Sequence, residues 1–198
     1  MDSYVITISR QFGSMGHSIA KELANKLNIS FYDRDIVEET SKRLGLPLST
    51  ISEKEELETS EYFKRIYPLG KGVTRLQDEI FMVQKNIIED LANKESCIIV
   101  GRCANGILAN RERILNVYIY APYEDRLKNC IEKLDMDETT AKKLIKEVDN
   151  SRKLYHKHYC PGFKDDTSNK DIIIDSSKFG VEGTADILTI IAKKIFDI

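Results

Sequence analysis

The hydrophobic residues of the chain follow two patterns that alternate along it. Short apolar runs rich in β-branched residues predict buried strands, and they lie at residues 5–8, 29–35, 96–102, 114–121 and 171–175. Apolar residues three to four positions apart predict a helix, as at Ile19, Leu23 and Leu27. Further helices are predicted from about residue 36, and over about 75–93, 124–133, 138–159 and about 182–196. Strands alternating with helices favour an α/β protein with a parallel sheet.

The apolar run at residues 96–102 is typical of the centre of such a sheet. It is continuous instead of alternating, as expected of a parallel strand covered on both faces. In open α/β sheets, ligands bind beyond the carboxyl ends of the strands. Arg10, Asp33 and Arg102 each follow such an end. We therefore expect the three to form an anion site at one edge of the sheet, although solvation explains any one of the arginines taken alone.

The first strand leads into a glycine-containing turn at residues 13–16 and then into a helix. A strand, a glycine loop and a helix N-terminus in this order form an anion-binding device, because unpaired N–H groups and the positive end of the helix dipole face the loop. The standard phosphate loop reads G-x-x-x-x-G-K-[ST]. Here Gln11 replaces the first glycine, His17 stands in place of the lysine, and Ser18 matches the hydroxyl. The alternative is an ordinary strand-to-helix turn.

Composition indicates one globular domain and excludes several classes of partner. The chain has 198 residues and a formal charge of −2, which predicts binding neither to a nucleic acid polymer nor to an acidic membrane. We find no apolar run near the length of a membrane span and no signal peptide, so we expect a cytoplasmic location. The 4 cysteines have no C-x-x-C spacing, so we expect reduced, mostly buried thiols and neither a zinc site nor a redox pair.

Two polar segments interrupt the regular alternation. Residues 51–72 are charged and irregular, which indicates part of a helical insertion. The helix predicted at 138–159 is unusually polar, and its Asp149, Arg152 and His156 share one face. A polar helical hairpin between two core strands is typical of a lid whose basic groups close over phosphates. The alternative is a solvated helix stabilised by ion pairs between successive turns.

Five segments, in order along nearly the whole chain, resemble the cytidylate-kinase-like family of P-loop proteins. They are ISRQFGSMGHSIAKEL, FYDRDIV, IIVGRCANGIL, DNSRKLYHKHY and IIIDSSKFGVEG. The resemblance implies a P-loop NTP hydrolase fold, an α/β fold with a five-stranded parallel sheet flanked by helices. It implies one kinase domain over residues 1–198, with a helical insertion for the nucleoside monophosphate at about 34–94 and a LID at about 123–165.

The resemblance also implies substrates and site residues. The family transfers the γ-phosphoryl group of ATP to CMP or dCMP with Mg²⁺. The residues expected to hold the phosphates of ATP are Gly13, Ser14, Met15, Gly16, His17 and Ser18, with Ser18 also contacting Mg²⁺. The residues expected to bind the acceptor nucleotide are Asp33, Arg34, Arg102 and Asp149. Arg126 and Arg152 are implied as LID residues that reach both substrates.

The loop departs from the family pattern at Met15, where a glycine is usual, and at His17, where a permanent cation is usual. Phosphoryl transfer depends on positioning and on charge stabilisation, so cations near the transferred group supply most of the rate. Arg10, Arg126 and Arg152 are therefore the catalytic candidates, because a closed lid would bring them to the γ-phosphate.

Two hypotheses about function follow. In the first, the protein is a nucleoside monophosphate kinase-like phosphotransferase with CMP or dCMP as acceptor, or with another small phosphate or alcohol. In the second, it binds nucleotides with little or no kinase activity and acts as a sensor or a partner-binding module. The changes at Met15 and His17 favour the second hypothesis. The retained Arg102, Arg126, Asp149 and Arg152 favour the first.

Overall fold

The core of the protein is one parallel β-sheet. The computed structural model describes residues 3–47, 71–160, 162 and 164–198, and for residues 34 and 71–75 it describes the backbone alone. The strands are β1 (Val5–Arg10), β2 (Ser30–Tyr32), β3 (Cys97–Val100), β4 (Ile114–Tyr120) and β5 (Ile172–Asp175). They pair in the order β2-β3-β1-β4-β5, every pair parallel. The predicted five-stranded parallel sheet is thus confirmed, with β1 as its central strand and β3 as the neighbour of β1.

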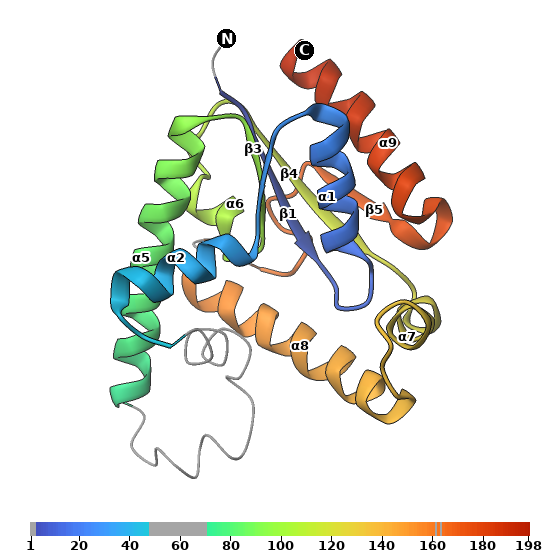
Figure 1. Cartoon of the computed structure of the whole chain (residues 1–198), viewed down its shortest axis with the longest axis horizontal. Coiled ribbons are helices and arrows are strands. Elements are labelled where there is room, and N and C mark those ends of the chain that lie inside the picture. The colour runs from blue at the N-terminus through green and yellow to red at the C-terminus, as the bar shows by residue number, and fades with distance from the viewer. Residues whose placement is uncertain (1–2, 48–70, 161, 163) are drawn as a thin grey trace.

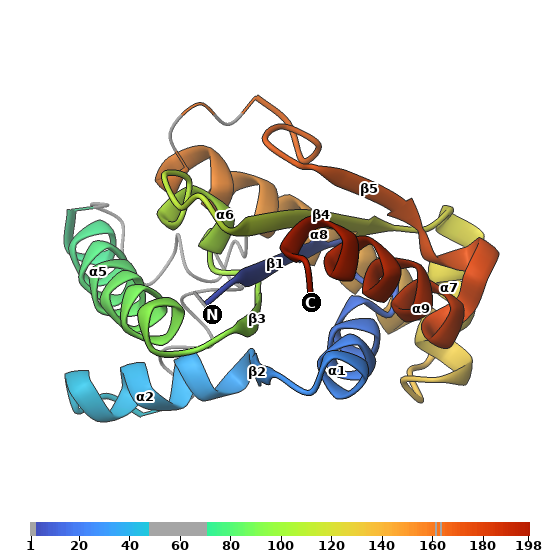
Figure 2. The ribbon, with the colours of Figure 1, turned by 90° about the horizontal axis from the view of Figure 1, so that it is seen from above.

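Helices cover both faces of the sheet, which explains the continuous apolar runs. One face packs against α1 (Gly16–Leu27) and α9 (Ser176–Phe196), and the other against α5 (Lys71–Lys94) and α6 (Ala104–Ile107), as Figure 2 shows. Alternate residues of a strand serve the two faces. Ile6 and Ile98 lie in the α1–α9 cluster, whereas Val5 and Cys97 lie in the α5–α6 cluster, and all four are fully buried.

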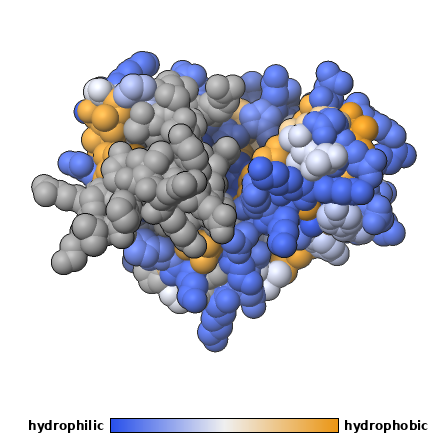
Figure 3. Space-filling model, turned by 90° about the horizontal axis from the view of Figure 1, so that it is seen from below, coloured by the Kyte–Doolittle hydropathy of each residue, from blue (hydrophilic) through white to orange (hydrophobic). Residues whose placement is uncertain are grey.

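The remaining helices lie near the carboxyl ends of the strands and beside α5. Helix α2 (Arg34–Leu44) packs against α5 through Val37 and Ile80. Helices α7 (Tyr123–Glu132) and α8 (Glu138–Tyr159) follow β4, and α8 crosses beneath the carboxyl end of β1 (Figure 1). The described surface on that side of the molecule is mostly hydrophilic (Figure 3), in agreement with the polar sequence of α8.

Several details differ from the sequence-based expectations. Helix α6 is short, at Ala104–Ile107, and was not predicted because four residues carry no periodicity. Helix α9 begins at Ser176, but its backbone is not helical at Gly180 (φ 67°), so the predicted start near residue 182 corresponds to the part after this break. Most of the predicted charged segment, residues 51–70, lies outside the described residues, and the insertion at 34–94 and the LID at 123–165 stay predictions. Among the described helices, none combines the length and the apolar composition that crossing a membrane requires.

Candidate active site

The loop between β1 and α1 is a tight turn that ends on an uncapped helix. Gly13 has a φ of 78°, and a Cβ there would lie 2.8 Å from the carbonyl oxygen of Arg126. Met15 takes a left-handed conformation (φ 61°) at the N-cap of α1, and its side chain makes no capping hydrogen bond. The first N–H groups of a helix have no partner within the helix. The start of α1 therefore presents backbone donors and a positive dipole end to a ligand.

Hydrogen bonds within the loop and from α9 and α7 fix its conformation. Ser14 Oγ donates to the carbonyl oxygen of Gln11 at 2.9 Å. Ser176 Oγ at the start of α9 donates to the Ser14 carbonyl at 2.8 Å, and Asn129 Nδ2 on α7 donates to the Gly13 carbonyl at 2.9 Å. The bonds from Ser176 and Asn129 hold loop carbonyls from outside the turn, so the backbone conformation of the loop is preorganised.

The two large apolar side chains of the loop are engaged in packing. Phe12 contacts the small cluster between α7 and α8 that contains Leu127 and Ile145. Met15 packs against the main core under α1. Neither side chain lines the pocket that opens beside the loop.

Arg10 lies where two glycines leave room for its side chain. A Cβ on Gly16 would come within 2.7 Å of the Arg10 Cβ and 2.8 Å of its Cγ. A Cβ on Gly101 would collide with the guanidinium group. The side chain of Arg10 therefore runs from the end of β1 past the start of α1 to the turn after β3, and it places a cation beside the loop. The sequence shows the two glycines but not that they serve Arg10.

Asp33, predicted to bind substrate, contacts side chains from two other segments. Its carboxylate accepts a 2.8 Å hydrogen bond from Arg102 and pairs with His17 Nδ1 at 2.7 Å. Burial of Asp33 works to raise the pKa of this carboxyl, but the nearby charges of Arg102 and Arg10 and the bond to His17 outweigh burial and hold the pKa below its usual value. Asp33 is thus an ionised group that orders Arg102. The neighbouring Arg34 begins α2, and its side chain lies outside the described part of the structure.

The turn after β3 has an unusual backbone. Gly101, Arg102 and Cys103 all have positive φ values, of 76°, 51° and 53°. A non-glycine residue in this region costs about 1–2 kcal/mol, and such outliers cluster at functional sites. The conformation turns the chain sharply after Val100 and accompanies the contact of Arg102 with Asp33 across the sheet edge.

Arg126 and Asp149, two further predicted site residues, form a clamp on the loop. Arg126 Nη1 donates to Asp149 Oδ2 at 2.5 Å and to the Phe12 carbonyl at 3.2 Å. Asp149 Oδ1 accepts the Phe12 N–H at 2.7 Å. Arg126 is only 8% exposed, so the Asp149 carboxylate, and not water, stabilises its buried positive charge. The pair thus joins α7 and α8 to the loop backbone.

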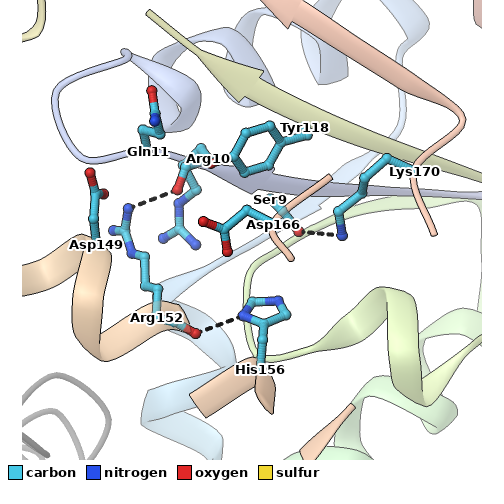
Figure 4. A pocket seen from close by; sticks show the side chains of 9 residues that line it. All are labelled: Ser9, Arg10, Gln11, Tyr118, Asp149, Arg152, His156, Asp166 and Lys170. Carbon is cyan, nitrogen blue, oxygen red and sulfur yellow. Dashed lines mark hydrogen bonds between the residues drawn. The ribbon is translucent and has the colours of Figure 1, made fainter. Parts of the chain in front are cut away.

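A small pocket of about 60 Å³ lies beside the loop, and Figure 4 labels the residues that line it. Three cations face it, Arg10, Arg152 and Lys170. Arg152 Nη1 donates to the Arg10 carbonyl at 3.1 Å, and Lys170 Nζ donates to Ser9 Oγ at 3.0 Å (Figure 4). Burial lowers the pKa of Lys170 and raises the pKa of the neighbouring Asp166. The cluster suits a small anion, which would compensate the buried positive charge.

The structure thus brings most predicted site residues to one end of the sheet. Arg10 lies near both the group around Asp33 and the group around Asp149, and both groups border the loop. Ser18 is half-buried in the first turn of α1. Sequence analysis missed Ser9, Tyr118, Asp166 and Lys170 as pocket residues. Asp166 and Lys170 lie in an aperiodic segment before β5, so no sequence pattern marks them.

The five-stranded parallel sheet and the glycine loop after β1 define the fold of the P-loop kinases. Residues 5–178 match the model of the cytidylate kinase-like family, and the protein belongs to that family.

Individual proteins are similar to this chain over nearly its whole length. A cytidylate kinase of Methanocaldococcus jannaschii is 27% identical over 189 residues, which cover 93% of this chain and 95% of that protein. The crystal structure of an uncharacterized protein from Eubacterium ventriosum has a TM-score of 0.73 and 28% identity, and the match covers 96% of this chain and 99% of that one. A shikimate kinase from Acinetobacter baumannii shares the fold, with a TM-score of 0.51, 16% identity, and coverage of 97% and 94%.

Proposed function

We propose that this protein is a nucleoside monophosphate kinase that transfers the γ-phosphoryl group of ATP to CMP or dCMP. The observation that carries the proposal is the position of Arg10, which Gly16 and Gly101 admit to the side of an uncapped glycine loop. The standard loop lysine is absent, and Arg10 supplies a permanent positive charge next to the same loop. The relative from M. jannaschii, a cytidylate kinase, supports the choice of acceptor.

The residues of the loop suit the phosphates of ATP and a magnesium ion. The amides at the start of α1 and the turn at Gly13 would bind phosphate oxygens. Ser18 offers the hydroxyl that P-loop proteins place on Mg²⁺. When bound, Mg²⁺ neutralises charge on the β- and γ-phosphates. The clamp of Arg126 and Asp149 keeps the loop in shape, so binding requires little rearrangement of its backbone.

The acceptor side has its own ordered cation. Arg102 is held by Asp33, which His17 also contacts. A phosphate of the acceptor would bind the Arg102 guanidinium in place of, or beside, this carboxylate. Arg152 and Lys170 add positive charge on the α8 side. Preorganised cations of this kind stabilise the charge that develops during phosphoryl transfer.

The test is a coupled assay of ADP release with Mg²⁺–ATP and each of CMP, dCMP, UMP and AMP. We expect turnover with CMP or dCMP and much less with AMP. Thermal shift measurements with the same nucleotides report binding independently of turnover. Binding of ATP and one monophosphate without ADP formation would contradict the proposal and support a nucleotide-binding protein without kinase activity.

Arg102→Ala tests the acceptor side. We expect the KM for the monophosphate to rise about 10-fold or more, the effect of losing a charge-assisted hydrogen bond, while the KM for ATP changes little. The control is Arg43→Ala, because Arg43 forms exposed ion pairs on α2. An equal rise in both KM values would count against this role of Arg102.

A further inference from the structure

Three side chains able to bind a metal converge beside the candidate active site. Cys103, His156 and Cys160 each offer a ligand atom, and these atoms lie within 4.8 Å of one another. Cys103 is fully buried and Cys160 is 6% exposed. Cys103 ends the left-handed turn after β3, whereas His156 and Cys160 lie at the end of α8. No C-x-x-C spacing marks this cluster, because the fold brings Cys103 to residues more than 50 positions later in the chain.

The imidazole of His156 is oriented as in known metal sites. Its Nδ1 lies 2.9 Å from the Arg152 carbonyl, and a carbonyl only accepts, so Nδ1 carries the proton. The lone pair is then on Nε2. Metal-binding histidines almost always donate their other N–H to a carbonyl or a carboxylate in this way.

The position of Cys160 depends on a glycine. A Cβ on Gly106 would lie 2.7 Å from the Cys160 sulfur, so α6 allows this sulfur to approach only because residue 106 has no side chain. Cys103 Sγ lies 4.0 Å from the Tyr155 carbonyl in the last turns of α8. The two thiols thus meet between α6 and α8.

We propose that Cys103, His156 and Cys160 bind Zn²⁺, a transition-metal ion that prefers thiolate ligands. The fourth coordination position of the ion is open to water. Two sulfurs and one imidazole nitrogen form a ligand set typical of Zn²⁺. Ligand atoms around tetrahedral Zn²⁺ lie about 3.5–3.8 Å apart. The observed separations, all within 4.8 Å, therefore need a contraction of at most about 1.3 Å. Each thiol loses its proton to solvent when it binds, which makes the site neutral overall.

The surroundings of the three ligands give a metal ion access to the site and let it affect nearby elements. A cavity of about 320 Å³ is lined by Cys160, Gly106 and Lys170, among others, and it offers a route for the ion and space for a water ligand. A bound ion would join the end of α8 to the turn that carries Arg102. It would thereby restrain two of the elements that border the candidate active site.

The experiment is a Co²⁺ titration of the reduced, metal-free full-length protein without nucleotide. We expect one Co²⁺ per chain, a thiolate-to-cobalt charge-transfer absorption band, and loss of this band when Zn²⁺ displaces Co²⁺. A saturating excess of Zn²⁺, about 100 times Kd, should raise Tm by about 5–10 °C. Because no nucleotide is present, these results do not depend on kinase activity.

Variants identify the ligands. Cys103→Ser and Cys160→Ser should weaken Co²⁺ binding by more than the ~10–100-fold that loss of an outer-shell partner costs. Gly106→Ala should weaken binding while all three ligands remain. Cys97→Ala is the matched control, because Cys97 is a buried cysteine of β3 outside the cluster. Circular dichroism and Tm without metal show which variants fold.

Three results would overturn the proposal. The first is the absence of a charge-transfer band in the reduced wild type with excess Co²⁺. The second is an unchanged band in a folded Cys103→Ser or Cys160→Ser variant. The third is a disulfide between Cys103 and Cys160 in a protein that, once reduced, binds neither ion, which would define a redox pair instead.

Discussion

Two carboxylates near Arg10, those of Asp33 and Asp149, differ in their surroundings. Among the described residues, the Asp33 carboxylate pairs with two side chains, the guanidinium of Arg102 and the imidazole of His17. Asp149 contacts the Arg126 guanidinium and, in addition, the backbone N–H of Phe12. One carboxylate therefore orders a cation, whereas the other orders the loop itself.

The difference distinguishes a carboxylate that a substrate phosphate can replace from a carboxylate that stays in place when substrate binds. A phosphate can take the place of Asp33 as a partner of Arg102, because both offer anionic oxygens. A nucleotide offers no corresponding substitute that would keep the Phe12 N–H, the Arg126 charge and the loop together. We therefore expect variants on the Asp33 side to change substrate binding and its pH dependence, and variants on the Asp149 side to change stability.

The largest effect is expected for Arg10→Met, which keeps an apolar stem against Gly16 but removes the cation beside the loop. Loss of a transition-state arginine lowers kcat by about 10³-fold. The measurement is ADP release at saturating substrates, with Arg43→Ala as control. A decrease below about 10-fold would show that Arg10 does not replace the missing lysine.

Asp149→Ala should have the next largest effect, on stability. It leaves the charge of Arg126 buried and the Phe12 N–H without its acceptor. Because Asp149 is partly exposed, we expect a loss of about 3 kcal/mol, the low end for breaking a buried pair. That corresponds to a Tm lower by about 6–12 °C. The control is Glu138→Ala, which removes an exposed ion pair with Lys142 on the same helix. Equal Tm values for the two variants would refute the clamp.

Asp33→Asn should lower stability in a pH-dependent manner. The folded pKa of Asp33 is depressed, so its contribution is fully present above the ordinary pKa of about 3.9 and is lost as the pH falls through the folded pKa. At neutral pH we expect the variant to be less stable by about 2 kcal/mol, and the difference should shrink below about pH 4. Urea unfolding of both proteins between neutral and acid pH measures it. A difference that grows on acidification would contradict the sign.

His17→Lys should have the smallest effect. The side chain of His17 is 54% exposed, and Arg10 already supplies a cation beside the loop. An exposed pair with Asp33 contributes at most about 1 kcal/mol, so kcat/KM should change less than about 5-fold. A large increase in the ADP-release assay would mean that the loop lacks a charge and that Arg10 does not provide it.

The sheet and the order of its flanking helices were predictable because local patterns encode them. Runs such as Ile98–Val100 are typical of strands covered on both faces, and the carboxyl ends of parallel strands lie at one edge of the sheet. This reasoning predicts Arg10, Asp33 and Arg102 at one edge of the sheet. It could not show that Arg126 pairs with Asp149, because that pairing depends on how α7 and α8 pack.

Other features depend on contacts that leave no local trace. Lys170 reaches the pocket from an aperiodic segment, and the role of Gly101 is to make room for a side chain 91 positions earlier. Cys103 and Cys160 meet only because the turn after β3 lies against the end of α8. The expectation against a zinc site rests on the spacing of neighbouring positions, so it does not cover residues that distant segments bring together.

Helix α8 connects three parts of the structure through side chains on one of its faces. Asp149, Arg152 and His156 follow one another on successive turns, at about 1.5 Å of rise per residue. They contact the loop, the end of β1 and the thiol cluster, respectively, so a displacement of this rod alters all three contacts together. A ligand that fixes α8 at one of these contacts would thereby strengthen binding at another, and by the same factor in either direction.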